Sequence, residues 1–314
     1  MNQTTITKQR GLSDFALKYF AMVCMILDHI HYFFSFTGKI PLFFSWIGRL
    51  AAPLFLFCIV EGFLHTHDRK KYFLRIYAIA IFMGLVQFSF YNIASGLVRP
   101  DGFFPQNQML ASFSVLLVVL WGIDRCQKKQ WIRGLSAILI PVFLPFLLYG
   151  LFAVSAAFGI PYGNFLLNLL VYSVLPCHTA IIDGGTATLL GGVILYLTHR
   201  HRRLQAGAFA LFVLAWDILP VLLFMPAGTS ASFFFTDAYE WLEVFCRYPY
   251  VMLQWNPWTR LQKAVLLVLS DAHLRAVRTF VPFVPDPLWN GFLIEMRFLW
   301  LTFSQLTMIP ASSR

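Results

Sequence analysis

The sequence predicts an all-α polytopic membrane protein with about eight to ten transmembrane helices. Of its 314 residues, 59% are hydrophobic and only 12% are charged, whereas about 25% of a soluble domain is charged. Apolar runs of about 20 residues, long enough to span a bilayer, recur along the chain. Basic residues gather between these runs, as the positive-inside rule expects of cytoplasmic loops, at 65–71, 124–129 and 199–203.

The first half of the chain alternates apolar runs with short polar connections. The first run follows a basic segment and is too long for the core of a signal peptide, so it predicts a retained helix that starts in the cytoplasm. Glycine and proline mark the turn at 38–41 that follows it. The runs predict helices at 15–36, 42–64, 72–91, 109–123 and 134–158.

The region 164–198 interrupts this regular pattern. Pro176 and the Asp183-Gly184-Gly185 segment divide it, and two complete spans here would place the basic cluster at 199–203 outside the cell. A broken or re-entrant segment avoids that conflict. One more apolar run follows at 204–225. We therefore predict a transmembrane domain at 1–226 and a divergent C-terminal region at 227–314, with room for one further helix.

The formal net charge of +10 indicates an anionic partner. Because the basic residues cluster between apolar runs, we expect anionic lipid or an anionic cofactor and no nucleic acid. The five cysteines are scattered without the spacing of a disulfide framework or a metal site, so neither is expected.

An aspartate and a histidine, Asp28 and His29, stand side by side inside the first apolar run. Placing an ionisable side chain inside the bilayer is energetically unfavourable, so such residues usually have a function. His29 lies seven residues before the outer end of its helix, and Arg49 lies seven residues after the outer end of the next. Both are thus about 10 Å deep at 1.5 Å per residue, so the three side chains can form one buried cluster. Alternatively, they form a structural ion pair that locks two helices.

A second polar layer is predicted near the cytoplasmic side. Glu61 lies about one turn before the end of the second helix and Arg75 about one turn into the third, so they can pair. His65 and the basic run at 69–71 lie just below. Alternatively, the same ion pair only holds two neighbouring antiparallel helices together.

Lys18 connects the two layers along the first helix. It precedes His29 by eleven residues, close to three turns, so both side chains share one face. That face suits a long anionic cofactor that enters from the cytoplasm. More commonly, a lysine at this position only extends its ammonium group to the membrane surface at the end of a helix. An imidazole can act as general base at neutral pH, and a neighbouring carboxylate raises its basicity. Adjacent helical residues point about 100° apart, so Asp28 could pair with Arg49 instead.

These residues also carry a family resemblance. The segments 18–30, 47–55 and 60–75 resemble, in order, the first three helices of the TraX family, membrane proteins associated with N-acetylation of conjugative pilin. The segments 107–110 and 183–185 resemble later parts of that family. The lysine and histidine spaced by ten residues are also similar to the Arg-x10-His pattern of acyltransferase-3 and heparan-α-glucosaminide N-acetyltransferase-type enzymes.

The resemblance implies acetyl-CoA as donor, bound from the cytoplasm, and transfer of acetyl to an amine acceptor without a metal. It implies His29 as the catalytic base, with Asp28, Arg49 and Glu61 in the site. The residues expected to bind coenzyme A are Lys18, His65, Arg69, Lys70, Lys71, Arg75, Asn107 and Asp183.

The sequence thus predicts an acetyltransferase of the inner membrane, multi-pass, with a cytoplasmic N-terminus and a pilin N-terminus as one candidate acceptor. Two alternatives stay open. Buried ionisable residues, Asp217 among them, could form the relay of a proton-coupled transporter, which uptake without acetyl-CoA would reveal. A non-enzymatic membrane assembly factor would co-purify with partners without turnover.

Overall fold

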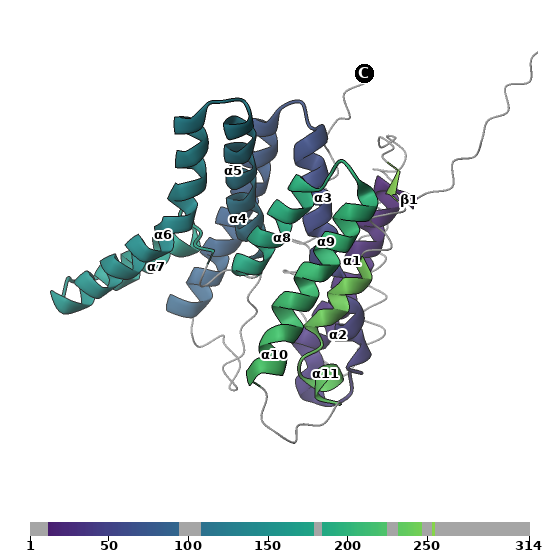
Figure 1. Cartoon of the computed structure of the whole chain (residues 1–314). Helices are drawn as coiled ribbons and strands as arrows, with labels where there is room; N and C mark the ends of the chain where they lie inside the picture. The colour runs from purple at the N-terminus through teal and green to yellow at the C-terminus, as the bar shows by residue number, and fades with distance from the viewer. Residues whose placement is uncertain (1–11, 94–107, 179–183, 225–231, 247–252, 255–314) are drawn as a thin grey trace, which may run out of the picture.

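A computed structural model describes residues 12–93, 108–178, 184–224, 232–246 and 253–254. Nearly all of these residues are helical, which confirms the all-α class (Figure 1). Two dipeptides, Leu12–Ser13 (β1) and Leu253–Gln254 (β2), pair in parallel. The predicted site residues Asn107 and Asp183 lie outside the described residues.

The helices follow the predicted apolar runs closely. In chain order they are α1 (Asp14–Phe34), the 3-10 turn η1 (Ser35–Thr37), α2 (Phe43–Gly48), α3 (Ala51–His65), α4 (Arg69–Asn92), α5 (Met109–Gln127), α6 (Trp131–Ala157), α7 (Gly163–Tyr172), α8 (Gly185–Leu197), α9 (Arg202–Val213), the π-helical turn η3 (Leu214–Ile218), α10 (Leu219–Phe224), α11 (Phe233–Thr236) and the 3-10 helix η4 (Glu240–Cys246).

The chain is a multi-pass membrane protein. Within the described residues, six helical segments are long and apolar enough to cross a membrane. Two shorter apolar helices, α7 and α8, occupy the predicted broken region between residues 164 and 198. The six segments are Ala16–Thr37, Phe43–His65, Arg69–Phe90, Met109–Gln127, Trp131–Ala157 and Arg202–Phe224.

The predicted helix at 42–64 is interrupted, and the interruption carries Arg49. Helix α2 ends at Gly48 and α3 begins at Ala51, so Arg49 and Leu50 form a turn between them. Pro53 lies in the first turn of α3 and has no N–H to donate to the Arg49 carbonyl four residues earlier. The proline therefore ends one helix and starts the next at this point.

Helices α3 and α5 form the centre of the bundle. Among the six spans theirs are the most buried, at 61% and 67%, whereas the α6 span is only 11% buried. A side chain added at Gly192 of α8 would collide with Leu116 of α5, so this glycine lets the two helices approach closely. The centre is thus fixed by tight apolar packing.

The first part of helix α6 packs against α5, and its second part leaves the bundle together with α7 (Figure 1). Pro141 and Pro145 lie inside α6, where each ring removes a backbone donor and favours a bend. Large apolar side chains on this hairpin are exposed, as expected of a surface in contact with lipid, including Phe146, Leu147 and Phe158.

Candidate active site

The structure brings Asp28 and Arg49 together. Arg49 Nη2 donates to Asp28 Oδ1 at 3.2 Å, and Ser45 Oγ donates to the same oxygen at 3.2 Å. A side chain added at Gly48 would overlap Asp28, so a glycine is needed where α2 meets α1. The carboxylate therefore takes the second of the two roles that the sequence left open, which is to balance Arg49.

The His29 imidazole makes a separate contact on α1. Its Nδ1 lies 2.8 Å from the backbone carbonyl oxygen of Met25. Because a carbonyl only accepts, Nδ1 carries the proton of this hydrogen bond, which leaves the Nε2 lone pair available as a base. The ring also stacks on Phe33, with centroids 6.5 Å apart. The helix itself thus sets the tautomer and the orientation of His29.

Asp28, His29 and Arg49 line one cavity of about 330 Å³. Its walls come from α1, the α2–α3 turn, α3, α4, α5, α8, α9, η3 and η4. Its lining is largely apolar and aromatic, with Phe55, Phe113, Phe212 and Trp216 among the larger side chains. A mostly apolar cavity with a few converging polar groups is the usual form of a small-molecule or catalytic site.

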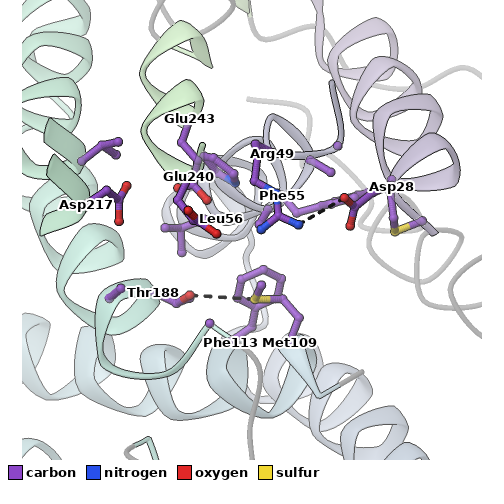
Figure 2. A pocket seen from close by; sticks show the side chains of 18 of the residues that line it. Asp28, Arg49, Phe55, Leu56, Met109, Phe113, Thr188, Asp217, Glu240 and Glu243 are labelled. Carbon is purple, nitrogen blue, oxygen red and sulfur yellow. Dashed lines mark hydrogen bonds and ion pairs between the residues drawn. The ribbon is translucent and has the colours of Figure 1, made fainter. Parts of the chain in front are cut away.

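An acidic wall faces this cluster across the cavity. Figure 2 shows Asp217, Glu240 and Glu243 on one side, Asp28 on the other and Arg49 between them. The Arg49 guanidinium also lies 5.6 Å from the centre of the Tyr239 ring. Sequence reasoning missed Glu240 and Glu243, because both fall in the region expected to be divergent. The sequence indicates Asp217 only as a member of the relay that a transporter would use.

The predicted Glu61–Arg75 pair is wrong. Glu61, 1% exposed, is held by Arg202 of α9 through two contacts of 2.6 Å, from Nη1 to Oε1 and from Nη2 to Oε2. The side chain of Arg75 is exposed, because α4 turns Tyr72 and Ile76 into the protein, which leaves Arg75 on the outward face of the helix.

The Glu61 layer is distinct from the cavity. Arg202 Nη1 also donates to Gln205 Oε1 at 2.9 Å, and its guanidinium lies 5.3 Å from the centre of the Phe57 ring. His65 Nδ1 is 3.7 Å from Glu61 Oε2. Glu61 follows Leu56, the last residue of α3 that lines the cavity, by five positions, about 7.5 Å along the helix. The structure therefore does not place Glu61 beside His29.

Two of the basic residues expected to bind coenzyme A, Arg69 and Lys71, have carboxylate partners on the protein, as does the neighbouring Lys128. Arg69 and Lys128 both bind Asp124, at 3.1 and 2.8 Å, and Lys71 binds Asp68 at 3.2 Å. Asp68 caps α4 by accepting the Lys71 backbone N–H, which lowers the pKa of its carboxyl.

The remaining predicted donor-binding residues differ in exposure. Lys70 is exposed, whereas Lys18 is 4% exposed on the inner face of α1. Arg202 was absent from the predicted site, although a glutamate deep in an apolar helix signals that a cation must reach it. Within the described ranges, no three His, Cys, Asp or Glu side chains gather as metal ligands.

Comparison with known families gives a match over most of the chain. A family model described as TraX protein matches residues 13–245. The chain belongs to the TraX family. The match begins at the start of α1 and ends within η4, so it includes every residue that lines the cavity, and it continues past the domain boundary predicted at residue 226. The likeness to acyltransferase-3 enzymes stays a prediction.

This TraX-family chain also resembles a curated protein over a shorter stretch. A probable fimbrial assembly protein FimC, serogroup H1, of Dichelobacter nodosus is 36% identical over 94 residues. The stretch covers 28% of this chain and 34% of that protein, so the chain spans about a third of the relative's length. No solved structure matches the chain.

Proposed function

We propose that this TraX-family protein is an acetyltransferase that moves an acetyl group from acetyl-CoA to an amine acceptor, the N-terminus of a pilin. The observation that carries the proposal is the cavity in which a histidine base, a carboxylate and a guanidinium converge. The name of the fimbrial assembly relative supports a pilin-type acceptor.

His29 is the general base of this proposal. Its Nε2 accepts a proton from the acceptor amine as the amine nitrogen attacks the thioester carbonyl carbon. The N–C bond forms, the C–S bond breaks, and coenzyme A leaves as a thiolate that takes up the proton. The Met25 carbonyl keeps His29 in the tautomer that this step requires.

Arg49 stabilises the negative charge that develops on the carbonyl oxygen. Its Nε is buried and has no hydrogen-bond partner within the described structure, while its Nη2 is bound to Asp28. A preoriented, unused donor of this kind is what an oxyanion site needs. Asp28 holds the guanidinium in place and balances its charge.

The donor would enter from the cytoplasmic side of the inner membrane, where the N-terminus of the chain also lies. Lys18 is about 16 Å from His29 along α1 at 1.5 Å per residue, a distance that suits a long donor with phosphates at one end. Lys70, Arg75 and the neighbouring basic residues supply further cations on that side. Asn107 and Asp183 remain candidate donor contacts.

Mass spectrometry of the acceptor tests this proposal. The full chain, reconstituted in vesicles, is expected to add one acetyl group to a pilin N-terminal peptide in the presence of acetyl-CoA. His29→Ala should abolish the product, whereas His31→Ala, which alters the same helix two residues further on, should retain it. Full activity of the His29→Ala protein would refute the proposal.

A non-enzymatic role in fimbrial assembly is the second candidate, and the name of the fimbrial assembly relative favours it. In that case fimbriae would assemble normally with the His29→Ala protein and no acetylated subunit would appear in the wild type. The two candidates therefore differ in the acetylation state of the assembled subunit.

A further inference from the structure

Two buried glutamines lie unpaired near one end of the bundle. Gln87 is 4% exposed and Gln108 is 2% exposed. The Nε2 and Oε1 atoms of both residues have no hydrogen-bond partner within the described part of the chain. Buried amides in folded proteins are almost always hydrogen-bonded, because an unsatisfied one loses its hydration without compensation. Two complete amides left open indicate that a polar partner binds there.

The two amides belong to one location. Gln108 precedes α5, and its Nε2 would be 3.3 Å from a Cβ placed on Gly84 of α4. Gln87 follows Gly84 by three residues, so it lies one turn along the same face of α4. The carbonyl oxygen of Tyr172, at the end of α7, also reaches Gly84 and would collide with any side chain there. We call Gln87, Gln108 and the Tyr172 carbonyl the glutamine niche.

The glutamine niche adjoins the cavity that contains His29. Met83 and Met109, the immediate neighbours of Gly84 and Gln108 in the chain, both line that cavity. Helix α4 begins beside the basic cluster at 65–71, and Gln87 lies near its other end. Helix α5 runs from the niche back toward the basic residues that follow it. The niche is therefore at the end of the bundle opposite the cations.

The chemistry of the niche selects a neutral ligand with both donors and acceptors. Glutamine amides supply N–H and C=O groups but no charge, so they complement a peptide group better than a phosphate or a carboxylate. The cations that would bind donor phosphates lie at the other end of α4 and α5. This placement separates the donor entrance from the niche.

We propose that Gln87 and Gln108 bind the backbone amides of the first residues of the acceptor polypeptide and so direct its N-terminal amine into the cavity. The identity of this ligand rests on the proposed function. The niche then determines that a polypeptide, rather than any small amine, is the preferred acceptor.

Binding measurements on the full-length protein in detergent, without acetyl-CoA, test the niche separately from catalysis. The probe is a ten-residue peptide with the N-terminal sequence of the host's major fimbrial subunit. Gln87→Met and Gln108→Met keep the side-chain size and remove an unsatisfied amide, so both proteins should fold with unchanged or higher Tm. Each should bind the peptide about fivefold more weakly, the effect of roughly one net hydrogen bond. Gln127→Met, at the exposed end of α5, is the matched control and should bind normally.

A second peptide identifies the contact. Methylation of its first two peptide nitrogens removes the N–H groups that would donate to the glutamine oxygens, so wild type should lose affinity for it. Each single variant keeps one of the two glutamines and should lose less affinity, and the double variant Gln87→Met with Gln108→Met should lose none. Equal affinity of wild type and both variants for the unmodified peptide, or no binding to wild type, would overturn the niche. Normal peptide binding without acetyl transfer would instead refute the proposed function and leave the niche intact.

Discussion

The two polar layers of this protein use similar residues in opposite ways. Asp28 and Arg49 are joined by one contact of 3.2 Å, are 21% and 29% exposed, and face a cavity. Glu61 is 1% exposed and has both carboxylate oxygens bound by Arg202 at 2.6 Å. The carboxylate oxygens of Glu61 are both bound, so that pair has no group free to bind a ligand. In the Asp28–Arg49 pair, the Arg49 Nε–H has no hydrogen-bond partner within the described residues and the cavity lies beside it, so this pair can bind a ligand. We infer that the Glu61 layer is structural and the Asp28 layer is functional.

The largest expected effect comes from breaking the Glu61 layer. Arg202→Ala should lower the free energy of unfolding by about 3 kcal/mol, because it leaves a buried carboxylate without its cation. Thermal or chemical unfolding in detergent measures this loss. The double variant Glu61→Leu with Arg202→Leu removes both charges and should recover most of the stability. A destabilisation of the double variant as large as that of the single one would contradict the structural role.

Within the cavity layer, Arg49→Lys should affect catalysis more than stability. Lysine preserves the positive charge beside Asp28 but lacks the Nε–H that we assign to the developing oxyanion. The loss of one such donor typically lowers kcat about 100-fold. Steady-state acetyl transfer at saturating donor measures the change. If Arg49→Lys lowers Tm strongly and leaves kcat unchanged, then the cavity layer is structural as well.

Gly48→Ala tests whether the close approach of α2 to Asp28 matters. The added methyl group would overlap the Asp28 side chain, so the Asp28–Arg49 contact must shift. Overpacking of this kind usually costs about 1–3 kcal/mol. Gly150→Ala is a suitable control, because nothing lies near its added methyl group. Equal Tm values for the two variants would show that α1 and α2 adapt freely.

The smallest expected effect is at the cap of α4, outside both layers. The pKa of Asp68 is lowered in the folded protein, so its carboxylate stabilises the fold at neutral pH, and this contribution disappears as the pH falls through that pKa. Asp68→Ala should therefore be slightly less stable than wild type at pH 7 and equal to it at low pH. Unfolding curves measured across this pH range provide the comparison.

The sequence predicted the contact between Asp28 and Arg49 because only the rise of the helix and one chain reversal were needed. It predicted the wrong partner for Glu61 because Arg202 is 141 residues away and arrives through the packing of α8 and α9. Spacing rules apply to neighbours within a helix or hairpin and give no information on such distant pairs. Arg75 had the right depth but points outward.

The helix break at Arg49 was encoded locally by Pro53, yet a continuous apolar run concealed it. The acidic wall had no local signal of comparable strength. Glu240 and Glu243 reach the cavity only because η4 packs against α3 and α9, a tertiary contact that hydropathy does not predict. The class of fold was therefore readable from composition and length, whereas the site depended on how distant segments pack.

Comparison of two histidine variants tests the central claim most directly. His29 lies in the cavity layer and His65 in the Glu61 layer, so each variant probes one layer. At saturating acetyl-CoA, His29→Ala should lower kcat for acetylation of a pilin N-terminal peptide by about 100-fold or more, the usual contribution of a general base. His65→Ala should retain kcat within a few fold. Equal kcat values for the two variants would contradict the assignment of chemistry to the cavity layer.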